Sequence, residues 1–343
     1  MNSPEHFSNA IAMRRMLYGR LLSSALYAAA SLRLPDLLHK QQQTAKELAM
    51  RVKADAATLD QLLRALAAFN VVTEQPNGKF ALTALGHTLR SDVPATARPT
   101  ALLVGGAIGK SWDGLIDAVS AGGPAFKGMF GMEFFPYLET QPELQSTFYD
   151  SQAADLDITL EELRVVDFAS YRTIVDVGGG DGALLAHVLT ACPRLRGVLM
   201  DTAPVVPKAR ERMVAVGLAD RCDVLVGNFF EAVPPGGDLY LMRDVLHDWP
   251  DERCAKLLAV CRRAMSKTAK LLIVERVSAG EAIAGQEAQL TRLMDLYMLS
   301  VLGGHERTLE QLERLLTSAG FARRACHRLS GGAAAIESVP LVG

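Results

Sequence analysis

One histidine and three carboxylates occur where predicted strands give way to loops, and these side chains can transfer protons. His247 and its neighbour Asp248 follow the fourth strand expected in the C-terminal half of the chain. Glu275 follows the fifth strand, and Glu306 lies in a glycine-rich loop before a predicted helix. Because nearby carboxylates hold an imidazole in one tautomer and make it more basic, these residues are candidates for general base catalysis.

Each of these residue types also occurs at such positions for structural reasons alone. A glutamate at the end of a strand often caps a loop, and a histidine before Asp-Trp-Pro can simply cap a helix. Metal ligation is a second chemical option, but the sequence contains neither H-E-x-x-H nor a dense cluster of histidine and cysteine. A serine nucleophile is not favoured, because no G-x-S-x-G occurs. We therefore expect acid–base chemistry without a metal.

A glycine-rich turn in the middle of the chain predicts a site for a nucleoside. A β-branched run from Thr173 breaks into Gly-Gly-Gly-Asp-Gly at residues 178–182, and apolar helix-forming sequence follows at once. Such a turn lets the polar groups of a ligand approach backbone N–H groups at the start of a helix. Asp201 ends the next apolar run, nineteen positions after Gly182, where an acid can accept hydrogen bonds from ribose hydroxyls.

The spacing of the glycines distinguishes between nucleoside ligands. Dinucleotide-binding turns follow G-x-G-x-x-G, whereas this chain has D-x-G-x-G-x-G, which is one residue tighter. A compact turn with no pyrophosphate to cradle favours S-adenosylmethionine over NAD. An ordinary glycine-rich turn of an α/β protein is the alternative, and Asp201 is the residue that argues against it.

Composition and charge narrow the class of protein. With 343 residues, two domains are expected, and 49% hydrophobic against 22% charged residues is typical of globular proteins with a substantial core. A net charge of −2 gives no electrostatic attraction to nucleic acid or to an anionic membrane. The five cysteines are scattered and form no C-x-x-C, which predicts that they are reduced. The first residues show no signal-peptide pattern, so we expect a cytoplasmic protein. The most apolar early stretch, residues 21–32, is too short to span a bilayer.

Residues 1–95 are predicted to form a winged-helix-like domain. Helical periodicity over 17–32, a capping box starting at Thr44 and a helix over 57–69 precede a hairpin with a Pro-Asn-Gly turn. Winged helices often bind DNA, but the helix over 57–69 carries Arg64 as its only base, which is too little charge to bind phosphates. A wide stripe of alanine and leucine instead favours a dimerisation domain, so we expect a homodimer that binds no nucleic acid.

The rest of the chain predicts an α/β fold. Residues 96–165 are expected to be a helical linker, and their methionines and aromatic side chains suit one wall of an apolar substrate pocket. From 166 to 343, strands alternate with helices, which predicts a doubly wound, mostly parallel sheet. Two segments around Ser-Gly-Gly, 322–329 and 333–338, are expected to close it as an antiparallel hairpin.

Five motifs occur in order along the chain. They are V-D-V-G-G-G-D-G at 175–182, M-D-T-A-P-V at 200–205, G-N-F-F at 227–230, R-D-V-L-H-D-W at 243–249 and G-H-E-R-T at 304–308. Together they resemble the S-adenosylmethionine-dependent O-methyltransferases related to plant caffeate and flavonoid enzymes and to bacterial enzymes that tailor natural products. The resemblance covers nearly the whole chain and implies a Rossmann-like class I methyltransferase sheet behind an N-terminal dimerisation domain.

The resemblance implies roles for the cofactor-binding residues. Gly178 corresponds to the turn beneath the cofactor, and Asp201 to the acid that binds the ribose. Asn228 and Phe229 match the pair that contacts adenine, and Arg243 matches a basic residue near the methionine carboxylate. Asn228 departs from the family's usual Asp, so the contact to the adenine amino group must use the amide oxygen or shift. Asp181 and Thr202 depart as well, from Thr or Asn and from Leu.

The resemblance also implies a reaction. His247 matches the general base, and Asp248, Glu275 and Glu306 match the acids that orient it. The hydroxyl of a small aromatic or polyketide-like metabolite would lose its proton to the histidine and attack the methyl group of S-adenosylmethionine, leaving S-adenosylhomocysteine. An apolar acceptor wall is expected at Met294, Met298, Val301 and Leu302. The alternatives are a nitrogen or carbon acceptor, another reaction on the same fold, or a winged-helix regulator that senses a nucleoside.

Overall fold

A computed structural model of the chain describes residues 4–154, 156–278 and 285–341. It divides into two compact units. Met1–Lys110 with Pro142–Ala154 form the first, and Ser111–Gln141 with Asp155–Gly343 form the second. The predicted linker, 96–165, is shared between these units, and the boundaries at 95 and 165 stay a prediction.

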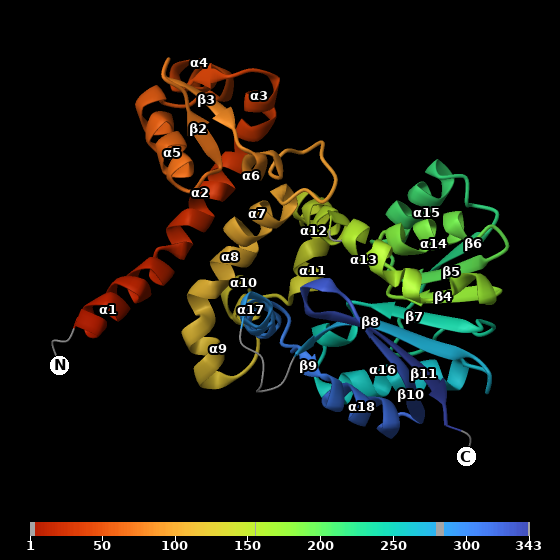
Figure 1. Cartoon of the computed structure of the whole chain (residues 1–343). Coiled ribbons are helices and arrows are strands. Elements are labelled where there is room, and N and C mark those ends of the chain that lie inside the picture. The colour runs from red at the N-terminus through yellow and green to blue at the C-terminus, as the bar shows by residue number, and fades with distance from the viewer. Residues whose placement is uncertain (1–3, 155, 279–284, 342–343) are drawn as a thin grey trace. The chain divides into compact units, whose positions relative to one another are not determined.

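The first unit is helical with a small antiparallel sheet of order β1-β3-β2, against which α3 and α5 pack (Figure 1). The predicted capping box at Thr44 is present, because its side chain accepts from the N–H of Glu47 and its own N–H donates to the Glu47 carboxylate. The expected hairpin is also confirmed as β2 and β3. The elements are α1 (Pro4–Leu17), α2 (Gly19–Ser31), α3 (Leu34–Lys40), β1 (Gln43–Thr44), α4 (Ala45–Val52), α5 (Ala56–Ala68), β2 (Val72–Glu74), β3 (Lys79–Leu82), α6 (Ala84–His87), α7 (Arg98–Gly105) and α12 (Pro142–Ala154). The boundary at Lys110 falls within α8 (Ala107–Ser111).

The second unit is built on one twisted sheet of order β10-β11-β8-β7-β4-β5-β6, with the short β9 paired to β8 (Figure 1). β6, β5, β4, β7 and β8 run parallel, whereas β11 is antiparallel to both β8 and β10. The α/β prediction and the closing hairpin are therefore confirmed. The strands are β4 (Thr173–Val177), β5 (Arg196–Asp201), β6 (Cys222–Val226), β7 (Leu239–Arg243), β8 (Lys270–Ser278), β9 (Arg307–Thr308), β10 (Phe321–Arg328) and β11 (Ala333–Pro340).

Apolar cores cover both faces of this sheet, because successive strand residues point to opposite sides. Ile174 and Leu241 belong to the core beside α14 and α15, and Val175 and Tyr240 to the core beside α16 and α18. The helices of this unit are α9 (Leu115–Ala121), α10 (Ala125–Phe130), α11 (Phe134–Glu139), α13 (Leu156–Glu162), α14 (Ala183–Ala191), α15 (Val206–Ala215), α16 (Asp251–Ala264), α17 (Gln286–Val301) and α18 (Leu309–Ser318), and the 3-10 turns are η1 (Trp112–Gly114), η2 (Leu163–Val165), η3 (Phe168–Ser170), η4 (Leu246–Asp248) and η5 (Ser330–Gly332).

One strand boundary differs from the sequence-based prediction. The sequence predicts Glu275 just beyond the fifth strand, but β8 continues to Ser278, so this residue lies inside the strand. Pairing explains the extension, because Glu275 and Arg276 face Ala334 and Ala333 of β11, and the last two residues of β8 pair with β9. The glutamate is therefore held inside a strand by its pairing with β11, and not in a loop.

Candidate active site

The glycine turn and the turn with His247 both lie where the order of the strands reverses. β4 lies between β5 and β7, so the chain leaves β4 toward one edge of the sheet and leaves β7 toward the other. Such a switch point opens a crevice at the carboxyl ends of the parallel strands. The glycine turn follows β4, and the turn with His247 follows β7.

The glycine turn has a backbone that other residues could not easily adopt. Gly178, Gly180 and Gly182 all have positive φ, at 75°, 59° and 78°. At Gly179 a Cβ would lie only 2.7 Å from a carboxylate oxygen of Asp176. Asp201, at the end of β5, holds this turn, because its Oδ2 accepts a hydrogen bond from the N–H of Gly180 at 2.8 Å.

Asp181, which stands where the family usually has Thr or Asn, has an ionic partner within the same unit. Its carboxylate pairs with the guanidinium of Arg212 on α15, which also donates to the Asp181 carbonyl at 3.0 Å. Asp181 Oδ1 accepts from the N–H of Ala183 at 3.1 Å, at the start of α14. The glycine turn is therefore tied to two helices.

Asp176 is a buried carboxylate inside β4, and the sequence pattern gave no role for it. Its Oδ2 has no hydrogen-bond partner among the described residues. Burial, assisted by the charge of Asp201, raises the pKa of Asp176 to about 7, while Arg243 opposes that rise. The signal that could have revealed this residue is an acid placed inside a buried β-branched strand, where an unpaired charge is costly.

Asn228 and Phe229 follow β6 and lie in different environments. The Asn228 side chain serves its own turn, since Oδ1 accepts from the N–H of Phe230 at 3.0 Å and Nδ2 donates to Glu231 at 2.8 Å. The ring of Phe229 approaches the glycine turn, because a Cβ at Gly178 would lie 3.6 Å from its Cε1. The structure thus brings Phe229 to the glycine turn, while the amide of Asn228 is already occupied.

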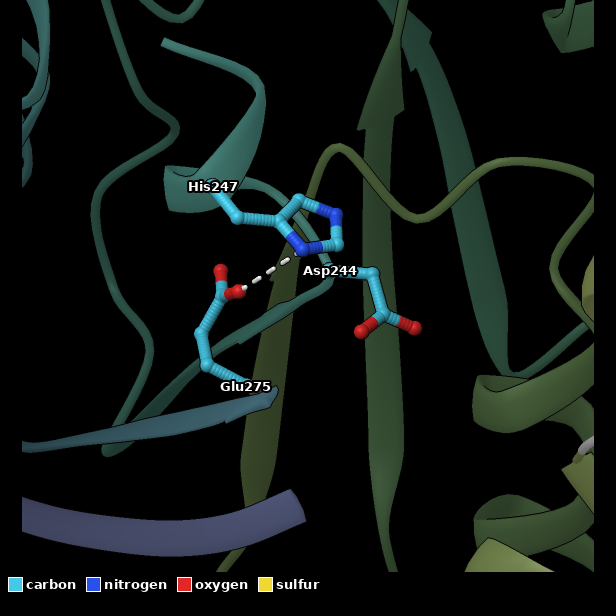
Figure 2. A group of neighbouring side chains, drawn as sticks. All are labelled: Asp244, His247 and Glu275. Carbon is cyan, nitrogen blue, oxygen red and sulfur yellow. Dashed lines mark ion pairs between the residues drawn. The ribbon is translucent and has the colours of Figure 1, made fainter. Parts of the chain in front are cut away.

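His247 lies in the short turn η4 and is surrounded by carboxylates. Its Nδ1 is 3.3 Å from Glu306 Oε1 and 3.5 Å from Glu275 Oε2, and its Nε2 is 3.5 Å from Asp248 Oδ1. The histidine is only 9% exposed, and the two glutamates are more deeply buried. Figure 2 shows the ring between Glu275 and Asp244, with the contact from Nδ1 to Glu275 dashed. The structure therefore brings together all four predicted catalytic residues.

Two neighbouring segments hold the turn in place. Glu275 Oε1 accepts from the N–H of Val245 at 2.9 Å and of Leu246 at 2.6 Å, so one oxygen supports the turn while the other faces the ring. On the other side, a Cβ at Gly304 would lie 1.9 Å from the carbonyl oxygen of His247, so only glycine allows this loop to approach. Glu306 itself is fixed by its N–H, which donates to Asp295 on α17 at 2.9 Å.

Burial and the neighbouring charges shift the pKa values of His247, Asp248 and Glu275. Burial alone would lower the pKa of His247, but the charges of Glu275, Glu306 and Asp248 raise it well above its usual value. Burial raises the pKa of Asp248 and that of Glu275 to about 7 each. Protonation in such a cluster belongs to the group rather than to one residue.

Asp244, His247 and Glu275 also lie close enough to share a cation, with one ligand atom of each within 4.8 Å of the others. Two of the three are already engaged, because Glu275 Oε1 accepts two backbone N–H groups and Asp244 pairs with Arg243 at 3.3 Å. A neighbouring guanidinium also disfavours a second positive charge. The expectation of a reaction without a metal stays a prediction.

Comparisons with known proteins match both units. Residues 112–322 match the O-methyltransferase domain and residues 15–92 the O-methyltransferase dimerisation domain. The chain is 41% identical to the O-methyltransferase SfmM3 of Streptomyces lavendulae over 95% of this chain and 99% of that protein. No helix within the described ranges has the length and apolar character to cross a membrane.

Two solved structures are similar to this chain over more than nine-tenths of its length. LaPhzM superposes with a TM-score of 0.90 at 34% identity, covering 97% of this chain and 99% of the other. The O-methyltransferase NcsB1 from neocarzinostatin biosynthesis, solved with S-adenosyl-L-homocysteine and 1,4-dihydroxy-2-naphthoic acid, has a TM-score of 0.81 at 33% identity, covering 93% and 96%.

Proposed function

Because this chain belongs to the S-adenosylmethionine-dependent O-methyltransferases, we propose that it methylates a phenolic hydroxyl of a small aromatic or polyketide-like metabolite. His247 is the general base that activates this hydroxyl. The observation that carries the proposal is the buried contact of His247 with three carboxylates at 3.3–3.5 Å. An imidazole so placed can accept a proton and be stabilised when it becomes charged.

The residues around the glycine turn fit the cofactor. Positive-φ glycines open the backbone to a ligand, and Asp201 remains able to accept ribose hydroxyls, because a carboxylate has about four acceptor positions. Asp176 Oδ2, which accepts no hydrogen bond from the part of the chain that the structure describes, suits the ammonium group of an amino acid, and the guanidinium of Arg243 suits its carboxylate. When bound, S-adenosylmethionine would supply an electrophilic methyl group on a positively charged sulfur.

The carboxylates determine which nitrogen of His247 acts. Glu306 and Glu275 both face Nδ1, so the neutral ring carries its proton there and presents the lone pair of Nε2. A phenol has a pKa of about 10, so a base at Nε2 raises the fraction of reactive phenolate at neutral pH. Asp248 lies beside Nε2 and is placed to stabilise the imidazolium that results.

Aromatic side chains near the turn favour a flat, apolar acceptor. Trp249 follows His247 closely and stacks with Phe135 of α11, the ring centroids being 6.3 Å apart. Phe126 and Phe130 of α10 stack at 4.4 Å, and α10 packs on α17, the helix with Met294 and Met298. An acceptor wall at these methionines, Val301 and Leu302 stays part of the proposal.

The function is tested with a panel of phenols, anilines and aromatic carbon acids and a cofactor labelled in its methyl group. Product analysis by mass spectrometry should place the label on a phenolic oxygen. Label on nitrogen or carbon only would contradict the proposed acceptor, and a gel-shift with genomic fragments checks the expectation that the chain binds no DNA.

We expect Glu306→Gln to shift the pH dependence of turnover toward lower pH. The contact with Glu306 raises the pKa of His247, and the base works only when deprotonated, so turnover should rise as pH increases through that raised pKa. Losing the carboxylate lowers this pKa, and the rising part of the profile moves with it. The plateau should fall too, because an amide cannot stabilise an imidazolium.

Rates measured from about pH 6 to about pH 10 test this expectation, since that range brackets the ordinary pKa values of histidine and a phenol. Glu310→Gln, on the exposed face of α18, is the matched control. A profile of Glu306→Gln that coincides with the parent's would show that this carboxylate does not act on the base.

We expect a homodimer at low micromolar concentration. Apolar side chains are exposed along α1 and the start of α2, including Met16 at 74%, Leu17 at 67% and Leu21 at 65%. A patch of this kind on helices usually marks an interface. Sedimentation should give a dimer, Leu21→Glu should shift it toward monomer, and Lys267→Glu, an exposed change in the other unit, should not. A parent that sediments as a monomer contradicts the expectation.

A further inference from the structure

Arg307 is a buried guanidinium that holds the backbone of the turn carrying His247. Its Nη1 donates to the carbonyl of Leu246 at 2.8 Å, and its Nη2 donates to the carbonyl of Trp249 at 2.7 Å. These two carbonyls flank His247 and Asp248, one on each side. The Arg307 side chain is only 2% exposed.

The charge of Arg307 is balanced by one carboxylate at the start of α16. Asp251 Oδ1 accepts from Nε at 2.9 Å and lies 2.8 Å from Nη2. A guanidinium is always charged, and burying it is costly unless its N–H groups are matched. Here one rigid, planar group makes three directed bonds, which a lysine could not reproduce.

Arg307 is also joined to the partner of the histidine ring. It follows Glu306 directly, and both precede the capping box of α18, in which Thr308 and Gln311 bond each other. β9 pairs Arg307 with Val277 of β8, the strand that contains Glu275. One short segment therefore places the carboxylate at Nδ1 and grips the backbone on both sides of the histidine.

We propose that Arg307 is a positioning residue that orients His247 toward the acceptor by fixing the carbonyls of Leu246 and Trp249. This role rests on the proposed function of His247 as the base. Without Arg307, the turn retains the two N–H bonds to Glu275, and the Cys254 thiol still donates weakly to the carbonyls of Leu246 and Trp249. It loses the two charged, directed donors on those carbonyls. A displacement of about 1 Å at a reacting group can cost about a hundredfold in rate.

Arg307→Ala should therefore lower kcat by about 10- to 100-fold and leave cofactor affinity within about twofold. Added guanidinium ion should restore part of the rate to this variant, because it can occupy the vacated space and donate to the same carbonyls. Arg307→Lys should also lose rate, since it keeps the charge but not the planar fork. Arg314→Ala, an exposed arginine on α18, is the matched control.

A double-mutant cycle with His247→Ala separates positioning from general stability. If Arg307 acts through the histidine, the variant with both changes should be no slower than His247→Ala alone. Parent-like rates in Arg307→Ala and Arg307→Lys, or losses that add in the cycle, would overturn the proposal. Should Arg307→Ala fail to fold, Arg307→Lys carries the same cycle. A parent-like rate in His247→Ala alone would instead refute the base itself.

Discussion

Replacing His247 with alanine is expected to lower turnover by about two to four powers of ten, which is the usual contribution of a general base. Cofactor affinity should stay unchanged, because the residues proposed to bind it lie in or after β4, at the end of β5, after β6 or at the end of β7. The comparison is made by single-turnover kinetics and calorimetry on the same preparation. His187→Ala, on the exposed side of α14, is the matched control.

The acidity of the acceptor provides the sharper form of this experiment. A phenol that already ionises at the assay pH does not need the base, so the loss in His247→Ala should shrink for acidic phenols and be largest for weakly acidic ones. If the variant methylates a weakly acidic phenol as fast as the parent does, the base lies elsewhere or positioning alone is sufficient. An equal loss across the panel would point to a role in orienting the acceptor.

Replacing Asp201 with alanine is expected to weaken cofactor binding by roughly a hundredfold or more. Each charge-assisted hydrogen bond to a ribose hydroxyl contributes about 1.5–3 kcal/mol, and a tenfold change in affinity corresponds to about 1.4 kcal/mol. The carboxylate also accepts from the N–H groups of Gly180 and Thr202, so its loss loosens the glycine turn as well. Calorimetric titration with S-adenosylmethionine and S-adenosylhomocysteine measures the effect.

Two further variants separate the ribose contact from the order of the turn. Asp201→Asn keeps an oxygen that can accept from Gly180 but removes the charge, so it should fall between the parent and the alanine variant. Asp223→Ala, an exposed acid on the neighbouring strand β6, should bind the cofactor normally. Parent-like affinity in Asp201→Ala would refute the assignment of this residue to the ribose.

Local features of this protein could be predicted from the sequence because they depend on near neighbours. The capping box at Thr44 needs only residues three apart. The hairpin of β2 and β3 needs only a tight turn between two β-branched or aromatic runs. The glycine turn is equally local, since the positive φ values of Gly178 and Gly182 follow from a strand that must reverse into a helix. Asp201 was predictable as the acid at the end of β5, because it directly follows a short apolar run.

The chemical environment of His247 was decided only by the tertiary structure. Glu306 lies fifty-nine positions along the chain, and its contact with Nδ1 exists because β9 adds to the edge of β8. The same pairing, with β11 on the other side, extends β8 past its predicted end and places Glu275 inside the strand, with one oxygen on the turn and one at the ring. The sequence shows Arg307 only as one residue of a motif. Its hydrogen bonds to the carbonyls of Leu246 and Trp249 depend on the folded position of that backbone. The sequence determined which side chains were available for the reaction, whereas long-range strand pairing and burial determined which of them face one another and how strongly their charges interact.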